Sequence, residues 1–399
     1  MPETAGRCDV AVVGGGPAGC SAAIHLALRG ANVVVLESRA YPHDKLCGEF
    51  LSPECAALLD GLGLTPTLRA LGPASIEIAC LTAPDGATWE SRLPGTALGL
   101  TRRALDLSLS QRAQAVGVDL RANATVTQIS GDLSRGFELR VARGSTVAGP
   151  AAQVRARAVI AAHGRRGALD KALDRRFLRQ AQHFVALKTH FTGPPLPGRI
   201  ELHGFPGGYC GLSEVERGTA PGGRAANVCL LVRDAVFRRV GGPGPERVPA
   251  FIGWMRQHNP RLDDWLSQAT QLDERWLSIA QVPFGPKRPV VNEILMAGDS
   301  AGLITPLAGD GIAMALRGGQ LAAGRMLAFL SGNQSAAALC KCYTRDWRRH
   351  FVGRVRLGRL LQVFMLRPWL LGFGLRLLNA APGMGEYMVT HTREAREAR

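Results

Sequence analysis

Residues 8–19, CDVAVVGGGPAG, decide the fold that the sequence predicts. This apolar run ends in glycines, SAAIHLALRG (21–30) continues with apolar residues at helical spacing, and ANVVVLES (31–38) returns to β-branched residues. A strand, a glycine-rich turn, a helix and a second strand form a βαβ unit, which is typical of a nucleotide-binding α/β domain.

The spacing of the glycines adds a chemical prediction. Gly14, Gly16 and Gly19 form G-x-G-x-x-G, and Glu37 ends the second strand 21 positions after Gly16. Such glycines let a pyrophosphate approach a helix N-terminus, and the carboxylate accepts hydrogen bonds from a ribose. The dinucleotide contacts predicted here are Gly14, Gly16, Pro17, Ala18, Gly19, Glu37 and Ser38.

A second glycine-rich loop lies about 280 residues later, in MAGDSAGLITPLAGDGIAMAL (296–316). Asp299 ends a predicted strand there, and the loop leads into a helix. Two such loops must meet in the fold if they serve one long ligand, which fits FAD better than NAD.

Composition limits the class of protein. The 399 residues include nine cysteines without a CxxC pair or a His/Cys ladder, so we predict no metal site and a reducing cytoplasm. The start MPETAGRCDV lacks the pattern of a signal peptide. A net charge of +16 indicates either attraction to anionic lipid or an acidic partner, or a solvated arginine-rich surface. Nucleic acid is disfavoured because only 6% of residues are aromatic and no binding module appears.

With these motifs in order, most of residues 8–330 resemble the flavoprotein superfamily of the p-hydroxybenzoate hydroxylase-type (group A flavin) monooxygenases and the geranylgeranyl reductases. The resemblance implies that Gly298 and Asp299 hold the ribityl and pyrophosphate region of FAD. It also implies that the loop PLAGDG (306–311) presents backbone N–H groups to the isoalloxazine ring, where a positive helix end stabilises reduced flavin. The FAD contacts implied in and after this loop are Gly309, Gly311 and Ile312.

A third similarity is R-x-x-L-D-x-x-L, which Arg102, Leu105, Asp106 and Leu109 match. It implies that Arg102 contacts the phosphate or adenosine part of FAD, although Arg103 beside it leaves a solvated first-turn arginine as the alternative.

The segment AAHGRRGAL (161–169) departs from the family pattern G-A-D-G, because His163 stands in place of the aspartate. The electron donor therefore stays open between NAD(P)H and another reductant such as a ferredoxin-like protein.

KLCGEFLSPE (45–54) resembles the K-x-C-G-E and S-P pattern of the branch that contains the geranylgeranyl reductases. The resemblance implies that Lys45 contacts the cofactor and that Cys47 and Gly48 lie by the isoalloxazine. Cys47 is then either a redox or proton-donating residue or a small polarizable residue packed on the flavin.

Tyr209, in FPGGYCGLSEVE (205–216), lies in a segment that resembles the family strand facing the flavin. The catalytic candidates are thus Cys47, Tyr209 and Pro306. His183, His190 and His203 could each deprotonate a phenol or simply pack in the fold. The W-x-W-x-I-P signature of flavin halogenases is absent from the sequence.

We expect an FAD-dependent oxidoreductase with an apolar small-molecule substrate. The sequence favours a monooxygenase that hydroxylates a phenolic lipid or polyketide-like ring through a flavin C4a-hydroperoxide. Two alternatives stay open: a geranylgeranyl-reductase-like enzyme that reduces isoprenoid double bonds, and a non-catalytic, FAD-bound, membrane-associated protein.

The predicted fold class is α/β: a Rossmann-like FAD-binding domain of the glutathione-reductase type, an inserted β-rich substrate domain and a helical C-terminal extension. The FAD-binding domain is assigned residues 1–70, 101–175 and 286–332, the substrate domain 71–100 and 176–285, and the basic extension 333–399. Arg367, Pro368 and Arg376 disfavour a spanning helix in this extension, which leaves an interfacial helix on an anionic membrane surface or a helix packed on the protein. The predicted localisation is cytoplasmic, with peripheral attachment to the inner face of the membrane as an alternative.

Overall fold

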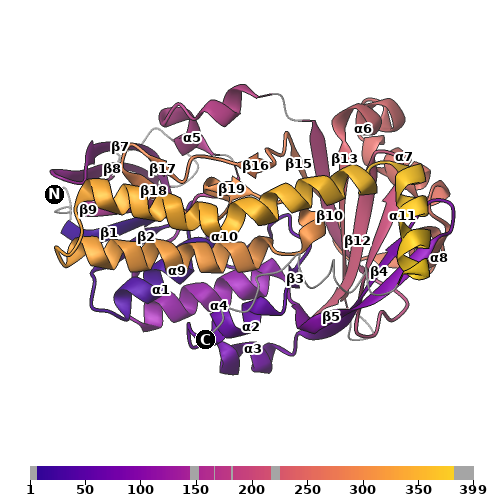
Figure 1. Ribbon diagram of the computed structural model, residues 1–399, viewed down its shortest axis with the longest axis horizontal. Coiled ribbons are helices and arrows are strands. Elements are labelled where there is room, and N and C mark those ends of the chain that lie inside the picture. Colours follow the sequence, from indigo (N-terminus) through magenta and orange to yellow (C-terminus); the bar gives the residue numbers. More distant parts are fainter. Residues whose placement is uncertain (1–6, 144–151, 166, 181–182, 217–224, 382–399) are drawn as a thin grey trace.

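The computed structural model describes five stretches of the chain, residues 7–143, 152–165, 167–180, 183–216 and 225–381. They form two large sheets that lie side by side and are bridged by long helices (Figure 1), and one small two-stranded sheet. The predicted α/β fold with a β-rich second region and C-terminal helices is therefore confirmed. The exact boundaries between the predicted domains stay predictions.

The first sheet has eight strands and contains the predicted βαβ unit. Its strands are β1 (Arg7–Val13), β2 (Val33–Leu36), β6 (Asp119–Arg121), β7 (Ala124–Asp132), β8 (Gly136–Arg143), β9 (Ala152–Ala161), β17 (Val290–Val291) and β18 (Ile294–Met296). The path runs β17-β18-β9-β1-β2-β6, and the β7–β8 hairpin joins it at β9. Because β1, β2, β9 and β18 run in parallel, their carboxyl ends share one edge, where ligands bind in such sheets.

Three helices pack beside this sheet: α1 (Pro17–Ala27), α4 (Arg102–Ala115) and α9 (Gly311–Leu330). Small side chains let α1 and α9 approach closely, since a Cβ at Gly319 would lie 2.3 Å from the carbonyl oxygen of Ala18. Ser21 Oγ also donates a 2.8 Å hydrogen bond to the carbonyl oxygen of Leu316. This contact holds the start of α9 next to the glycine turn at the start of α1.

The second sheet has nine strands: β3 (Phe50–Leu51), β4 (Ala74–Thr82), β5 (Thr88–Gly99), β10 (Phe184–Thr192), β11 (Arg199–Phe205), β12 (Gly208–Val215), β13 (Ala225–Arg233), β14 (Thr270–Gln271) and β15 (Leu277–Ala280). Its path is β14-β10-β13-β12-β11-β4-β5-β3, with β15 beside β10. The pairs along this path are antiparallel except for β11 with β4.

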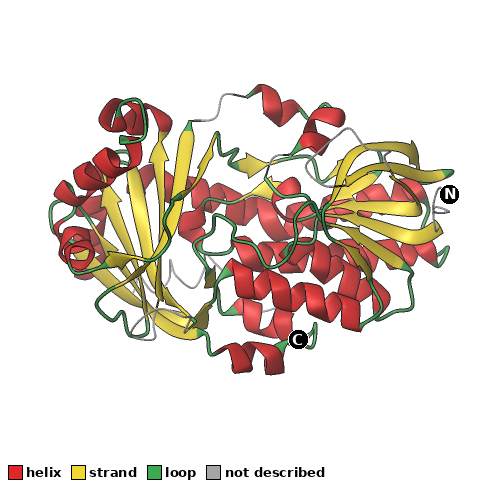
Figure 2. Ribbon diagram, turned by 180° about the vertical axis from the view of Figure 1, so that it is seen from behind, coloured by secondary structure: helices red, strands yellow, loops and turns green. Residues whose placement is uncertain are grey.

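The two faces of this sheet have different neighbours. Helices α6 (Asp234–Gly241), α7 (Arg247–Gln257) and α8 (Pro260–Ser267) cover one face, where Val185 and Leu187 of β10 join a buried core with Phe251. Ala186, between them, points to the other face and lines a cavity. That face is turned toward the first sheet, and loops gather between the two sheets in the view from behind (Figure 2).

Shorter elements complete the fold. They are helices α2 (Glu54–Asp60), α3 (Thr65–Leu71) and α5 (Ala168–Ala172), the 3-10 turns η1 (Arg176–Arg179), η2 (Gly298–Ser300) and η3 (Pro306–Ala308), and the pair β16 (Gly285–Pro286) and β19 (Gly302–Leu303).

The C-terminal helices run along both regions. Helix α10 (Ala336–Met365) follows α9 and reaches the second sheet, where α11 (Pro368–Ala380) turns away at 107° and packs on the sheet (Figure 1). Within the described part of the chain, neither helix is long and apolar enough to cross a bilayer alone, although the bent pair together has the length and composition of a broken span.

Candidate active site

The glycine turn after β1 has the backbone shape that the motif predicts. Gly14 has a φ of 101°, and its N–H donates to the carbonyl oxygen of Leu36 at 2.8 Å. A Cβ at Gly14 would lie 2.4 Å from the carbonyl oxygen of Ala162, so a side chain does not fit. Helix α1 then begins at Pro17 without a side-chain cap, so its N-terminal N–H groups are left for an anion.

Gly19 has a different position from the other predicted glycines, because it does not line the cavity. A Cβ there would lie 1.8 Å from the carbonyl oxygen of Gly14. Gly19 thus permits the close packing of α1 on the turn rather than ligand contact.

Glu37 holds the glycine turn in place. Its buried carboxylate follows β2, and Oε2 accepts a 2.7 Å hydrogen bond from the N–H of Gly15 while Oε1 accepts one from the N–H of Arg39 at 3.1 Å. The same carboxylate borders the cavity next to Ser38, which is where a ribose would lie.

The downstream loop meets this turn, as the sequence predicts for one long ligand. Gly298 has a φ of 60°, and a Cβ there would lie 2.9 Å from Cβ of Ala18. Lys287 stabilises the loop from behind, since its Nζ donates to the carbonyl oxygens of Asp299 (2.8 Å) and Arg165 (2.6 Å).

The loop that contains Pro306 is held by Tyr209. The Tyr209 hydroxyl accepts a 3.0 Å hydrogen bond from the N–H of Leu307 and lies 3.4 Å from Oγ1 of Thr305. Gly309 turns the chain with a φ of 67°, and α9 begins two residues later at Gly311. The N-terminus of α9 therefore borders the cavity at Gly311 and Ile312.

Two cations lie beside the glycine turn. A Cβ on Gly16 would be 3.7 Å from both Nη2 of Arg102 and Nζ of Lys45. Asp106 orients them: it accepts two hydrogen bonds from Arg102 (2.8 and 2.7 Å) and lies 3.7 Å from Lys45. Arg103 points elsewhere, is exposed, and pairs with Asp44 at 3.6 Å. The geometry thus places Arg102, rather than Arg103, at the glycine turn.

The segment around Cys47 is anchored by both regions of the molecule. The carbonyl oxygen of Cys47 accepts a 3.2 Å hydrogen bond from Nδ2 of Asn227, and that of Leu46 accepts one from Nη2 of Arg165 at 2.8 Å. Sγ of Cys47 accepts from the N–H of Glu49 at 3.4 Å. These bonds fix the half-buried thiol at the cavity wall.

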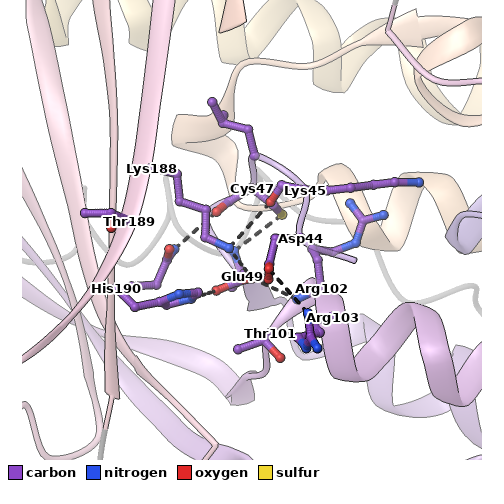
Figure 3. Close-up of polar contacts among 12 residues, drawn as sticks. Asp44, Lys45, Cys47, Glu49, Thr101, Arg102, Arg103, Lys188, Thr189 and His190 are labelled. Atoms are coloured by element: carbon purple, nitrogen blue, oxygen red, sulfur yellow. Dashed lines mark hydrogen bonds and ion pairs between the residues drawn. The ribbon is translucent and has the colours of Figure 1, made fainter. Parts of the chain in front are cut away.

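A buried ionic cluster lies behind Cys47 (Figure 3). Lys188 Nζ forms an ion pair with Oε1 of Glu49, and Nε2 of His190 lies 2.7 Å from Oε2. The N–H of Arg102 donates to Oε1 at 2.8 Å, which places the carboxylate at the N-terminus of α4. On the solvent side, Nδ1 of His190 lies 3.0 Å from the half-exposed Asp273.

Glu49 is held in a strained conformation by these partners. Its φ is 54°, in the left-handed region that costs a non-glycine residue about 1 kcal/mol or more. Burial alone would raise the pKa of Glu49, but the hydrogen bond from His190 and the charge of Lys188 lower it. Burial would likewise lower the pKa of His190, yet the hydrogen bond and charge of Glu49 raise it. Lys188 and His190 thus share one buried carboxylate, which stabilises the protonated form of His190.

Sequence reasoning missed most of this cluster. Glu49 appears there only as a letter of the K-x-C-G-E pattern, and Lys188 and Asn227 do not appear at all. A signal exists for Lys188, because a lysine within the apolar strand FVALKTHFT requires a buried partner.

At the segment that departs from the family pattern, His163 contacts a second buried carboxylate. Its Nε2 lies 3.0 Å from Oδ1 of Asp170, which Arg175 also binds at 3.0 Å. Burial alone would raise the pKa of Asp170, but the interaction with His163 and Arg175 lowers it. Arg175 also donates to the carbonyl oxygen of Ser300 at 2.6 Å, so this group supports the downstream loop.

All these segments open onto one cavity of about 680 Å³ between the two sheets. Of the eighteen predicted site residues, all except Gly19 line it. They are Gly14, Gly16, Pro17, Ala18, Glu37, Ser38, Lys45, Cys47, Gly48, Arg102, Tyr209, Gly298, Asp299, Pro306, Gly309, Gly311 and Ile312. Which of these act in catalysis stays a prediction. No three His, Cys, Asp or Glu side chains within the described ranges gather as a metal site.

The residues present fit FAD. The glycine turn leaves room that a Cβ would fill, the N-termini of α1 and α9 border the same cavity, and Lys45 and Arg102 supply positive charge for a pyrophosphate. Glu37 would bind the ribose, and the loop from Pro306 to Gly311 would contact the ring system.

A family model described as "FAD binding domain" matches residues 7–207. The chain belongs to this family, within the group A flavin monooxygenase superfamily. It is therefore an FAD-dependent oxidoreductase.

Two relatives extend over most of the chain. A menaquinone reductase of Mycobacterium tuberculosis is 27% identical over 333 residues, covering 79% of this chain and 75% of the relative. Digeranylgeranylglycerophospholipid reductase 1 of Methanopyrus kandleri is 27% identical over 354 residues, covering 86% of each.

Solved structures share the fold. The flavin-dependent brominase Bmp2 has a TM-score of 0.79 at 18% identity, covering 97% of this chain and 93% of its own. A myxobacterial chondrochloren halogenase has a TM-score of 0.77 at 21% identity, covering 90% and 83%. At these identities the likeness concerns the fold alone.

Proposed function

We propose that this FAD-dependent oxidoreductase reduces a carbon–carbon double bond of an isoprenoid lipid. The observation that carries the proposal is the chemistry of the cavity wall on the second sheet: it is apolar, and its titratable groups hold their protons. Hydroxylation of an aromatic ring, which the sequence alone ranks first, is the rival that the experiment below distinguishes.

The wall suits a long apolar chain. Ala79 of β4, Leu93 of β5, and Ile200 and Leu202 of β11 line this part of the cavity. Apolar side chains on adjacent strands bind a hydrocarbon by burial of apolar area.

The titratable groups at the wall are acids rather than bases. Burial raises the pKa of Cys229 to about 12 and also raises the pKa of Tyr209. Both groups line the cavity. Groups that stay protonated at neutral pH suit a reaction that needs a proton delivered, not one that needs a phenol deprotonated.

The three histidines considered as bases lie away from this wall. His183 is exposed, and His190 lies between Glu49 and Asp273. His203 is fully buried, 2.8 Å from Oγ1 of Thr82 and 3.3 Å from Glu201. None of the three is among the described residues that line the cavity.

The reaction assigns separate tasks to cofactor and protein. Reduced FAD, when bound, supplies a hydride equivalent, and the two electrons come from a donor that is NAD(P)H or a ferredoxin-like protein. The chain binds the alkene against the apolar wall and excludes water. The Cys47 thiol, fixed by Asn227, then gives a proton to the second alkene carbon and regains one from water.

The relatives support the substrate class. One is named for reduction of a quinone and another for reduction of a digeranylgeranyl lipid. Both names describe reductases.

The test is an anaerobic turnover of the dithionite-reduced, FAD-loaded protein with a geranylgeranyl lipid, followed by mass spectrometry. We expect a product with two added hydrogen atoms and, in D₂O, two deuterium atoms per reduced bond, because dithionite supplies only electrons and both hydrogens derive from solvent. A Cys47→Ala variant should keep FAD and slow the reaction about 100-fold or more, with partial recovery in Cys47→Ser. An alkylphenol is offered in parallel, and a product of it that forms only with dioxygen and carries an added oxygen atom would establish hydroxylation instead. Loss of neither substrate under either condition would favour a non-catalytic protein.

A further inference from the structure

Exposed apolar side chains concentrate on the last two helices. Of the nine large apolar residues that are exposed within the described ranges, six lie between residues 360 and 377. Trp369 is 69% exposed, Phe373 63% and Leu360 56%. The group, called here the elbow surface, consists of Leu360, Val363, Phe364, Trp369, Phe373 and Leu377.

The elbow surface is one side of two amphipathic helices. In α10, Arg356, Leu360 and Val363 are exposed, and spacings of four and three residues place them on one side of the helix. Arg367, also exposed, directly precedes α11. In α11, Trp369, Phe373 and Leu377 are exposed at intervals of four, whereas Leu371 and Leu375 are buried in a core with the second sheet. Helix α11 therefore carries a second apolar side that the fold leaves exposed.

Within the segment of the chain that carries the elbow surface, the aspartate, glutamate, lysine and arginine residues are all arginines. Residues 347–381 contain seven arginines and no aspartate or glutamate. Arg354 is bound to Glu54 at 2.8 Å and Arg376 to Asp85 at 2.9 Å. Arg356 and Arg367 are exposed beside Leu360 and Phe364, so cations rim the apolar patch.

This combination matches the interface of an anionic bilayer. Aromatic side chains favour the headgroup level, and arginine stems cover apolar surface while their guanidinium groups reach phosphates. A second copy of the chain would bring Arg356 and Arg367 of both elbows together, and this repulsion opposes docking of two such surfaces. The bend of 107° and the buried side of α11 favour docking on the bilayer over crossing it.

We infer that the elbow surface docks this protein onto an anionic lipid bilayer, with Trp369 and Phe373 inserted at the interface and Arg356 and Arg367 on the lipid phosphates. The inference rests on the surface and does not depend on which reaction the cavity performs.

Helix α10, which carries part of the elbow surface, also contacts the wall of the cavity. Arg359 Nη2 donates a 2.7 Å hydrogen bond to the carbonyl oxygen of Phe284, which lines the cavity. Gly358 packs against Ile304, another lining residue, since a Cβ there would lie 3.3 Å from Cγ1 of Ile304. Docking would therefore bring the wall of the cavity close to the lipid.

The experiment is co-sedimentation of the full-length, FAD-loaded protein with phosphatidylcholine vesicles that do or do not contain phosphatidylglycerol. Wild-type protein should bind the anionic vesicles, and the double variant Trp369→Ser/Phe373→Ser should bind about tenfold or more weakly. Arg356→Gln/Arg367→Gln should lose about fivefold per arginine on anionic vesicles and little on neutral ones.

Matched controls remove the same chemistry elsewhere. Leu28→Ser/Leu272→Ser removes exposed apolar side chains, and Arg238→Gln/Arg239→Gln removes exposed arginines of α6. Both should bind like wild type, and all variants should keep FAD absorbance. Absence of wild-type binding to anionic vesicles overturns the inference, as does equal loss in the control variants. Concentration-dependent self-association that Trp369→Ser/Phe373→Ser abolishes, without vesicle binding, would assign the surface to a second copy of the chain.

Discussion

Nε2 of His190 lies 2.7 Å from Oε2 of Glu49, although 141 residues separate the two in the chain. This contact joins the second sheet to the segment that carries Cys47, and Lys188 adds an ion pair to the other carboxylate oxygen. Because Glu49 has no exposed surface, its charge depends on these partners. The cluster thus positions the Cys47 segment between the two sheets.

Glu49→Gln should destabilise the fold by about 3–5 kcal/mol, because Lys188 would be left as a buried cation with a weakened partner. Urea denaturation followed by circular dichroism measures the loss. Glu77→Gln, at an exposed position, should change stability by less than about 0.5 kcal/mol. The double variant Glu49→Gln/Lys188→Met should recover part of the loss, and strictly additive losses would contradict the pairing.

The pH dependence of stability should report His190. Its pKa is raised in the folded state, so its contribution is fully present below its unfolded pKa of about 6.5 and is lost as pH rises through the folded value. The difference in Tm between wild type and His190→Gln should therefore be largest near pH 6 and shrink at alkaline pH. Scanning calorimetry across this pH range measures the difference in Tm. A difference that stays constant or grows toward alkaline pH would mean that Glu49 does not stabilise the protonated form of His190.

Arg102 and Arg103 should differ in their effect on FAD affinity. Arg102→Ala removes a cation beside Gly16 and should weaken FAD binding about 10- to 100-fold in fluorescence titrations. Arg103→Ala, which removes an exposed pair with Asp44, should change it less than about threefold. Because Arg102→Ala also leaves Asp106 unpaired, Arg102→Ala/Asp106→Ala tests the cation without that penalty. Equal effects of the two substitutions on FAD affinity would instead support the alternative that Arg102 is a solvated first-turn arginine.

The cofactor half of the site was predictable because each motif constrains its own backbone. Gly14 needs a positive φ, and Glu37 accepts a hydrogen bond from the turn only 22 residues away. The spacing of these residues in the sequence is therefore enough to predict the local geometry. The contact between the glycine turn and the Gly298 loop was predicted differently. It followed from the length of FAD, which has to reach both loops, and not from a sequence pattern.

The remaining parts depend on contacts between distant segments. Lys188 and Glu49 are 139 residues apart, and the sequence around either residue does not indicate that they pair. Likewise, the apolar run around Trp369 and Leu371 does not reveal which of the two is exposed, because that depends on where the second sheet lies. The role of Gly19 was predicted as ligand contact, whereas the structure places it in helix packing.

Gly19→Ala should therefore act on the fold first. The new Cβ would lie 1.8 Å from a backbone oxygen, which cannot move aside as a side chain would, so we expect a loss of about 3 kcal/mol and a weaker FAD site. Gly253→Ala, at an exposed position of α7 with open space, should be neutral or stabilising by up to about 1 kcal/mol. Thermal unfolding with and without FAD compares them; a Gly19→Ala protein as stable as wild type would contradict the packing role.

Lys287 should control the downstream loop. Lys287→Met removes the donor to two carbonyl oxygens, those of Asp299 and Arg165, and should cost about 1–3 kcal/mol at neutral pH. Burial lowers the pKa of Lys287 to about 8, below its unfolded value, so the penalty for burying its charge is present below pH 8 and fades as pH rises toward the unfolded value. Wild type should therefore gain stability over Lys287→Met between pH 8 and pH 10, whereas the exposed Lys171→Met should show no such trend. If the difference in Tm between wild type and Lys287→Met narrowed between pH 8 and pH 10, the result would show that the folded protein holds the lysine charged and well solvated.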